Sequence, residues 1–307
     1  MKYSGIGGQA VIEGIMMKNK DEYATAVRTP SGKIEVKKET YISIVQKYPI
    51  LKLPFVRGIF AFSDSMILGM RSLKFSASFF EDDEGEPSKF EKFLDKVFGE
   101  KLEKVIMTLS IIFSFFVAIG IFILLPLFLS SLIKRVVDNH FIISLVEGII
   151  RISIFVIYIK LISNMKDIGR TFMYHGAEHK CINCIETGNP LTVENVMKSS
   201  RLHKRCGTSF IIIVMIISIL FFMLIRVDNV WLRFVIRILL IPVIAGVSFE
   251  FLNLAGRSDS KIVDFFSKPG FWMQGLTTAE PTEDMVEVAI VAVEEVFDWK
   301  KYLDENF

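Results

Sequence analysis

Residues 105–133 read VIMTLSIIFSFFVAIGIFILLPLFLSSLI, a stretch without a charged side chain. A helix needs about 20 apolar residues to cross the hydrocarbon core of a bilayer, so this run is long enough. Three further apolar stretches follow at residues 141–163, 209–225 and 230–254. The chain is 51% hydrophobic with a mean hydropathy of +0.45, and a soluble chain of 307 residues has no core for runs of this length. We expect an α-helical membrane protein with four transmembrane helices.

The distribution of basic residues predicts the orientation. Four crossings put both chain ends on the same side as the loop 165–208, which is rich in lysine and arginine, whereas the two opposite connections are short. The positive-inside rule therefore makes the ends and this loop cytoplasmic. Residues 1–14 are glycine-rich with one lysine and do not resemble a signal peptide. The lipid bilayer of the cell (inner) membrane is the expected partner; we expect no nucleic-acid partner and leave self-association open.

The sequence before the first crossing divides into two parts. Residues 1–48 are expected to form a small cytoplasmic α+β region, because three short apolar runs surround a Thr-Pro-Ser-Gly turn. The expected strands are Val11–Met17, Tyr23–Arg28 and Ile34–Lys38. Residues 49–104 are expected to hold an amphipathic membrane-surface helix, an acidic linker and a helical lead-in to the first crossing; these are residues 55–80, 81–87 and 89–104.

The sequence after the last crossing, residues 255–307, is expected to be a cytoplasmic tail with one amphipathic helix at residues 281–299. Pro281 suits the first turn of a helix, and the acidic residues that follow favour its positive end. One apolar stripe runs along this helix: Met285, Val288, Ala289, Ala292 and Val296.

The clearest indication of a chemical function is the sequence His175-Gly-Ala-Glu178-His179 in the predicted cytoplasmic loop. On a helix the two imidazoles lie one turn apart, with the carboxylate on the same face. The order His-x-x-Glu-His is that of the inverzincin metallopeptidases, in which the glutamate is the general base. We predict that His175 and His179 bind a divalent metal ion, zinc before others, and that Glu178 activates water at it. The competing interpretation is that the histidines only form hydrogen bonds in a basic surface loop.

A third ligand has to come from outside this pentapeptide. His203 and Cys206 lie three residues apart just before the third crossing, and zinc accepts both imidazole and thiolate. Glu186 shares the helix face of His175 but lies about 16 Å further along the axis, too far to join the same ion. All three cysteines fall in the predicted cytoplasmic loop, where thiols stay reduced and no disulfide framework is expected.

Five blocks, in order along the chain, carry a family resemblance: GGQAVIEGIMM (7–17), HGAEHK (175–180), LTVEN (191–195), RLHKRCG (201–207) and TTAEP (277–281). Together they resemble the YqhQ-like family, bacterial multi-pass proteins described as predicted metal-dependent enzymes. The resemblance spans essentially the whole chain and brings in Gln9 and Glu13. Glu13 is then a third metal ligand, a carboxylate that orients a histidine, or a strand-end glutamate facing water; the sequence leaves these three open.

Charged residues also occur inside the predicted crossings. Glu147 and Arg151 are spaced i, i+4 in the second crossing, and Arg237 reaches a comparable depth in the fourth. We predict that Glu147 pairs with Arg151, Arg237 or both as a structural staple, with a substrate or ion path as the alternative. Glu250 lies near the cytoplasmic end of the fourth crossing and would extend the histidine site toward the membrane.

The sequence as a whole favours a metal-dependent membrane hydrolase with its site on the cytoplasmic face. A peptide or a lipid-linked molecule is the expected substrate, the peptide by motif analogy alone. The alternative is a non-enzymatic membrane protein, either a transporter, a sensor or an assembly factor, in which the His/Cys cluster is structural.

Overall fold

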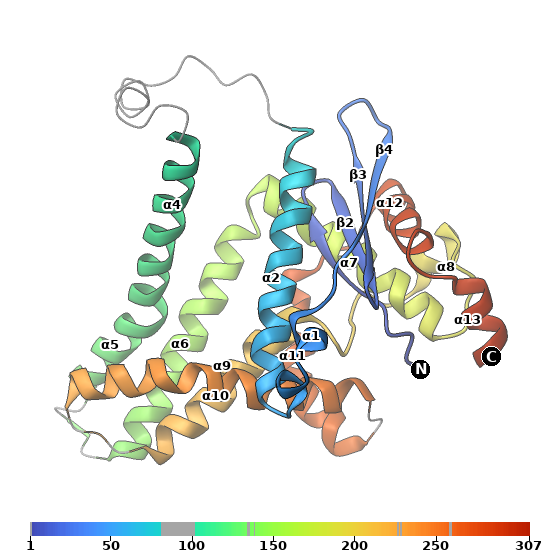
Figure 1. Cartoon of the computed structure of the whole chain (residues 1–307). Coiled ribbons are helices and arrows are strands. Elements are labelled where there is room, and N and C mark those ends of the chain that lie inside the picture. The colour runs from blue at the N-terminus through green and yellow to red at the C-terminus, as the bar shows by residue number, and fades with distance from the viewer. Residues whose placement is uncertain are drawn as a thin grey trace. The chain divides into compact units, whose positions relative to one another are not determined.

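The computed structural model describes residues 2–80, 102–133, 136–137, 139–225, 227, 229–257 and 260–307 (Figure 1). The chain forms two compact units, one from residues 1–80 with 158–307 and the other from residues 81–157. The predicted helical class with a small N-terminal sheet is confirmed. The predicted acidic linker and most of the lead-in helix lie outside the described residues.

The N-terminal sheet has four antiparallel strands in the order β1-β2-β3-β4. Their bounds are Gly7–Val11, Gly14–Asn19, Glu22–Arg28 and Ile34–Thr40. The single strand predicted at Val11–Met17 is wrong, because the chain turns back at Ile12 and Glu13. Glu13 adopts a left-handed φ of 48°, and its carbonyl accepts a hydrogen bond from the Arg28 amide at 2.8 Å. A continuous apolar run hides such a turn, since Val11 at the end of β1 and the first residues of β2 are buried on either side of it.

Helices cover both faces of this sheet (Figure 1). Ile15 and Met17 belong to a core shared with α7 (Lys166–Glu186) and α12 (Glu283–Glu294), whereas Met16 packs with Leu68 of α2 (Val56–Ala77). Successive residues of a strand point to opposite faces, so a strand between two helical layers is apolar at every position. This explains the Ile-Met-Met sequence of β2.

The C-terminal part differs from the prediction in two ways. The expected helix at residues 281–299 ends at Glu294, and a separate helix α13 (Trp299–Asn306) follows, because the Asp298 side chain caps it by accepting from the Lys301 amide at 3.0 Å. The predicted apolar stripe is buried as expected. A helix that the sequence did not indicate, α11 (Lys261–Thr277), precedes this region.

Four helical segments are long and apolar enough to cross a membrane, and this confirms the predicted number among the described residues. They are Thr108–Ile133, His140–Ile162, Gly207–Leu224 and Trp231–Gly256. The last two lie in the larger unit as α9 (Gly207–Leu224) and α10 (Val230–Arg257), which pack against each other, with α11 against α9 and α2 against α10. The short elements of this unit are α1 (Ile44–Lys47), η1 (Pro49–Lys52) and α8 (Val193–Lys198).

The smaller unit contains α4 (Leu102–Ile119), a π-helical turn η3 (Gly120–Leu124), α5 (Leu125–Ile133) and α6 (His140–Ile162) up to residue 157. Pro126 has no N–H to offer the carbonyl of Phe122, and this carbonyl accepts from Arg151 Nε at 3.2 Å. Arg151 also donates to Glu147 at 2.9 Å, as predicted, and Ser130 donates to the same carboxylate at 3.3 Å. The buried charges of this unit are therefore satisfied at the helix irregularity, which favours the structural staple.

Candidate metal centre

Three donor side chains converge where α7 meets the start of α9. His175 and His179 lie in the middle of α7, and Cys206 is the N-cap residue of α9. One ligand atom from each lies within 4.8 Å of the other two. His175 Nε2 is 3.2 Å from Cys206 Sγ, and the two imidazole centroids are 4.4 Å apart. The predicted helix thus brings the two histidines together, and α7 begins at Lys166, nine residues before His175.

The main chain fixes the orientation of both imidazoles. His175 Nδ1 lies 2.9 Å from the carbonyl oxygen of Thr277, and His179 Nδ1 lies 2.7 Å from that of Arg201. A carbonyl oxygen can only accept, so each Nδ1 carries the proton and donates it. In the neutral form of each imidazole, Nε2 then keeps its lone pair, which is the arrangement found in histidines that bind a metal.

A close crossing of two segments holds the Thr277 carbonyl in place. The chain leaving α11 runs over α7, where the Ala279 amide donates to the carbonyl of Phe172 at 2.9 Å. A Cβ atom on Gly176 would lie 2.1 Å from the Ala279 carbonyl oxygen, so only glycine fits there. A glycine in a helix costs about 1 kcal/mol relative to alanine, and the crossing explains why the helix carries one between its two histidines.

The electrostatics favour a thiolate at Cys206. Burial raises the pKa of the Cys206 thiol, but His175 and His179 lower it further, and it ends well below its usual range. Burial also disfavours the charged form of His175 and so lowers its pKa. The neighbouring thiolate outweighs this effect and raises the pKa of His175 to about 9. The Cys206 Sγ also accepts from the Thr208 amide at 3.4 Å in the first turn of α9. A buried thiolate beside two imidazoles is a donor set that zinc prefers.

Glu178 lies beside this group with one oxygen unsatisfied. Its side chain is buried, and Oε2 has no hydrogen-bond partner among the described residues. Burial raises the pKa of the carboxyl group, against the opposing effects of the two histidines and the Gly8 amide, which hydrogen bonds to it. A Cβ on Gly8 would lie 3.0 Å from Glu178 Cδ, so the glycine lets β1 approach the carboxylate. No role was predicted for Gly8, and its only signal in the sequence is its place in the first family block.

Two of the three candidates for the third ligand lie elsewhere. Glu13 sits in the β1–β2 turn, where Arg170 of α7 binds its carboxylate through two nitrogens and the Tyr174 hydroxyl donates to it at 3.3 Å. Glu13 thus forms an ion pair at the strand end and lies outside the group of His175, His179 and Cys206. The ring of His203 lies 5.7 Å from that of His179, but its Nε2 faces Glu186 at 3.5 Å. Cys206 is the candidate that completes the group.

Glu186 organises the end of α7. Its carboxylate accepts from the Ser4 amide at 2.9 Å, from the Ser4 hydroxyl at 2.7 Å and from Arg205. It thus ties the N-terminal segment and the residue next to Cys206 to α7. Its distance from the histidine group agrees with the helix geometry expected from the sequence.

The remaining predicted residues make contacts outside the centre. Glu250 accepts from Arg57 Nε at 2.7 Å and from the Phe55 amide at 3.2 Å, so it joins α10 to the start of α2 and does not extend the histidine site. The side chain of Gln9 packs against Gly69 of α2. The Arg237 guanidinium lies 4.7 Å from the centre of the Phe222 ring. A pair between Glu147 and Arg237 stays a prediction.

Comparison with known proteins places these residues in a family. The model of the family described as "Protein of unknown function (DUF1385)" matches residues 53–299, which include both histidines and Cys206. The chain belongs to the DUF1385 family. It is also 38% identical over 304 residues to "Uncharacterized protein YqhQ" of Bacillus subtilis (strain 168), covering 98% of this chain and 94% of that protein. No solved structure matches. The YqhQ-like resemblance is confirmed, and the family description supplies no reaction.

Proposed function

We propose that this protein is a membrane-anchored, metal-dependent hydrolase. The observation that carries the proposal is the convergence of His175, His179 and Cys206, with both imidazoles held by carbonyls through Nδ1. These residues would hold a divalent ion, zinc before others, with one position left for water or substrate as in catalytic zinc sites. A bound ion supplies Lewis-acid activation of water and of a substrate oxygen.

Glu178 is the proton carrier in this proposal. Its unsatisfied Oε2 accepts the proton of the attacking water, and the Gly8 amide holds the carboxylate in place. Burial raises the pKa of Glu178 above its ordinary value, and this favours return of the proton from the same carboxyl group to the leaving group. A glutamate exposed to solvent would hold a proton poorly at neutral pH. Burial of Glu178 therefore suits an acid–base role.

The proposed substrate is a peptide or a lipid-linked molecule at the bilayer surface. Cys206 caps α9, a helix apolar enough to cross a membrane, so the centre lies at the end of a membrane-length helix. We place this end, both chain termini and the loop 165–208 on the cytoplasmic side of the cell membrane, from the charge distribution.

Metal binding is tested by cobalt titration of the purified, metal-stripped protein in detergent micelles. Co²⁺ bound to two imidazoles and a thiolate should give intense visible bands and a thiolate charge-transfer band, saturating at one ion per chain. Cys206→Ser should remove the charge-transfer band and weaken binding by more than the roughly 10–100-fold cost of losing a hydrogen-bond partner of a ligand. Cys184→Ser is the matched control, since this second buried thiol lies outside the donor group. Equal spectra for the two variants would refute the site.

A catalytic metal site has an open fourth coordination position, whereas a structural site has a protein ligand there, and this difference can be tested. Acetohydroxamate should shift the visible bands of the Co²⁺ protein if that position is open. In the alternative, His203 turns from Glu186 to fill it: the hydroxamate would then change nothing, and His203→Ala would alter the spectrum. Glu178→Gln should keep the bound ion and abolish hydrolysis of a fluorogenic membrane-anchored peptide or lipid-linked ester. Full activity in that variant would remove Glu178 from the mechanism.

A further inference from the structure

Helix α11 buries polar as well as apolar side chains. Its inner face packs against the first turns of α9 and contains Ser267, Gln274 and Thr277 beside Val263 and Met273, all buried. Gln274 bonds to both main-chain groups of His203 and to Ser209 Oγ, at 2.6–2.8 Å. A surface helix in water carries polar residues on its outer face, so large aromatic residues on the outer face of α11 favour a partner other than water there.

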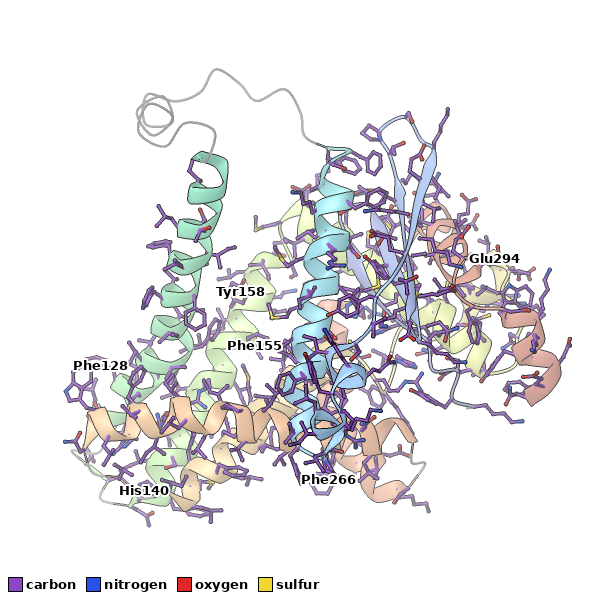
Figure 2. All side chains as sticks on the ribbon, in the orientation of Figure 1. Phe128, His140, Phe155, Tyr158, Phe266 and Glu294 are labelled. Carbon is purple, nitrogen blue, oxygen red and sulfur yellow. The ribbon has the colours of Figure 1, made fainter. Side chains whose placement is uncertain are left out.

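The outer face of α11 carries aromatic and basic residues. Phe265, Phe266 and Trp272 are 62%, 55% and 53% exposed, and Phe266 is labelled in Figure 2. Lys261 and Lys268 are exposed on the same side, and Lys268 Nζ lies 5.5 Å from the centre of the Phe265 ring. On a helix, residues spaced four, three and four apart share one face, which groups Lys261, Phe265, Lys268 and Trp272.

This face continues the apolar surface of α10. The ring of Phe266 meets that of Phe251 in α10 edge to face, with centroids 6.5 Å apart, and Leu254 in the last turns of α10 is 55% exposed. Few residues separate the end of α10 from the start of α11. If α10 crosses a bilayer, α11 therefore begins at its surface.

From these contacts we propose that α11 docks in the headgroup region of an anionic bilayer, with its aromatic rings at the acyl boundary and its lysines on lipid phosphates. This rests on the membrane anchoring stated under the proposed function. Aromatic rings flanked by lysine are the composition of interfacial helices. With Lys261, Asp264, Lys268 and Pro269, α11 is too polar to be a fifth crossing.

The helix proposed to dock on the bilayer also contacts the candidate metal centre. α11 ends at Thr277, whose carbonyl accepts from His175 Nδ1 at 2.9 Å, so one helix connects the lipid contact to a proposed ligand. A lipid surface that positions α11 therefore also positions the imidazole. The site would work on substrates presented by the same leaflet.

The test is depth-dependent quenching of Trp272 by brominated lipids. The full chain has three tryptophans, so Trp231→Phe with Trp299→Phe leaves Trp272 alone. The protein is reconstituted in vesicles of phosphatidylcholine and phosphatidylglycerol that carry bromine either near the headgroup or near the chain end. We expect the shallow bromines to quench Trp272 about twofold more strongly than the deep ones. Lys261→Gln with Lys268→Gln should reduce this quenching only when phosphatidylglycerol is present.

Two single-tryptophan controls separate the outcomes. Trp231, at the start of α10 and 77% exposed, should be quenched, whereas Trp299 in α13 should not. If Trp231 is quenched and Trp272 is not, a protein partner or a second copy covers α11, and the docking proposal is overturned while the anchoring stands. Stronger quenching by the deep bromines also overturns it. If neither tryptophan is quenched, the membrane anchoring itself fails.

Discussion

Replacing Glu186 by glutamine should make the protein less stable in a pH-dependent way. The carboxylate is 3% exposed and accepts hydrogen bonds from Ser4 and Arg205, with His203 Nε2 at 3.5 Å. Burial raises the pKa of Glu186, but these partners outweigh it and lower the pKa from 4.5 to about 2. The folded protein therefore holds the carboxylate ionised where the unfolded chain would protonate it.

The size of the effect follows from this difference. A shift from 4.5 to about 2 corresponds to about 3 kcal/mol of stability, at about 1.36 kcal/mol per unit. Because the pKa of the folded state is the lower one, the contribution of Glu186 is fully present above pH 4.5 and is lost as the pH falls toward 2. Between pH 5 and pH 3 about 2 kcal/mol of it should disappear. Glu186→Gln removes this pH-dependent part.

The assay is equilibrium urea unfolding in detergent micelles, followed by tryptophan fluorescence at pH 7, 5 and 3. The difference in unfolding free energy between the parent and Glu186→Gln should be largest at pH 7 and should shrink by about 2 kcal/mol between pH 5 and pH 3. Glu194→Gln is the control, since it removes the same charge from an exposed pair with Lys198 and should leave the curves unchanged. A difference that stays constant with pH would refute the reasoning, because Gln would then act through packing alone.

Two further substitutions test the centre and the membrane-length helices. Gly176→Ala should cost about 1–3 kcal/mol in unfolding free energy and weaken Co²⁺ binding, because its Cβ would displace the Ala279 carbonyl. Gly275→Ala, where a Cβ meets nothing within 4 Å, should do neither. Glu147→Gln should lower the thermal midpoint in micelles and cost about 3–5 kcal/mol, since it leaves Arg151 buried without its carboxylate. Leucine at both positions should recover most of that loss; no recovery would mean that the pair acts beyond stability.

The membrane-length helices were predictable because length and hydropathy alone decide them. The first apolar run contains no charge, and no packing detail could change its assignment. α11 was not predictable for the opposite reason. Its buried face holds Ser267, Gln274 and Thr277, whereas Phe265, Phe266 and Trp272 are exposed, so its periodicity indicates no clear buried side. The turn at Glu13 was not predicted because the residues next to it, at the end of β1 and at the start of β2, are buried. An apolar run across such a turn resembles one strand.

The candidate centre was half predictable. Helical periodicity places His175, Glu178 and His179 on one face, and the structure agrees. The choice among Glu13, His203 and Cys206 depends on how irregular segments fold, which no periodicity records. Arg170 forms an ion pair with Glu13, and His203 Nε2 faces Glu186, so local polar contacts hold these two candidates away from the group. Cys206 remains because the N-cap position turns its side chain toward α7.

The orientation of the two imidazoles comes from main-chain carbonyls, and a carbonyl leaves no signature in the sequence. Any residue at position 277 or 201 can offer one, so the identity of the side chain there does not decide whether the imidazole has an acceptor. The path itself requires Gly176, because no other residue lets the chain after α11 cross α7 so closely. At this centre, a residue that contacts a ligand should therefore tolerate substitution better than one that does not. Thr277→Ser should keep the Co²⁺ spectrum, whereas Gly176→Ala, which touches no ligand atom, should change it. If both variants bind Co²⁺ like the parent, the crossing does not hold His175 in place.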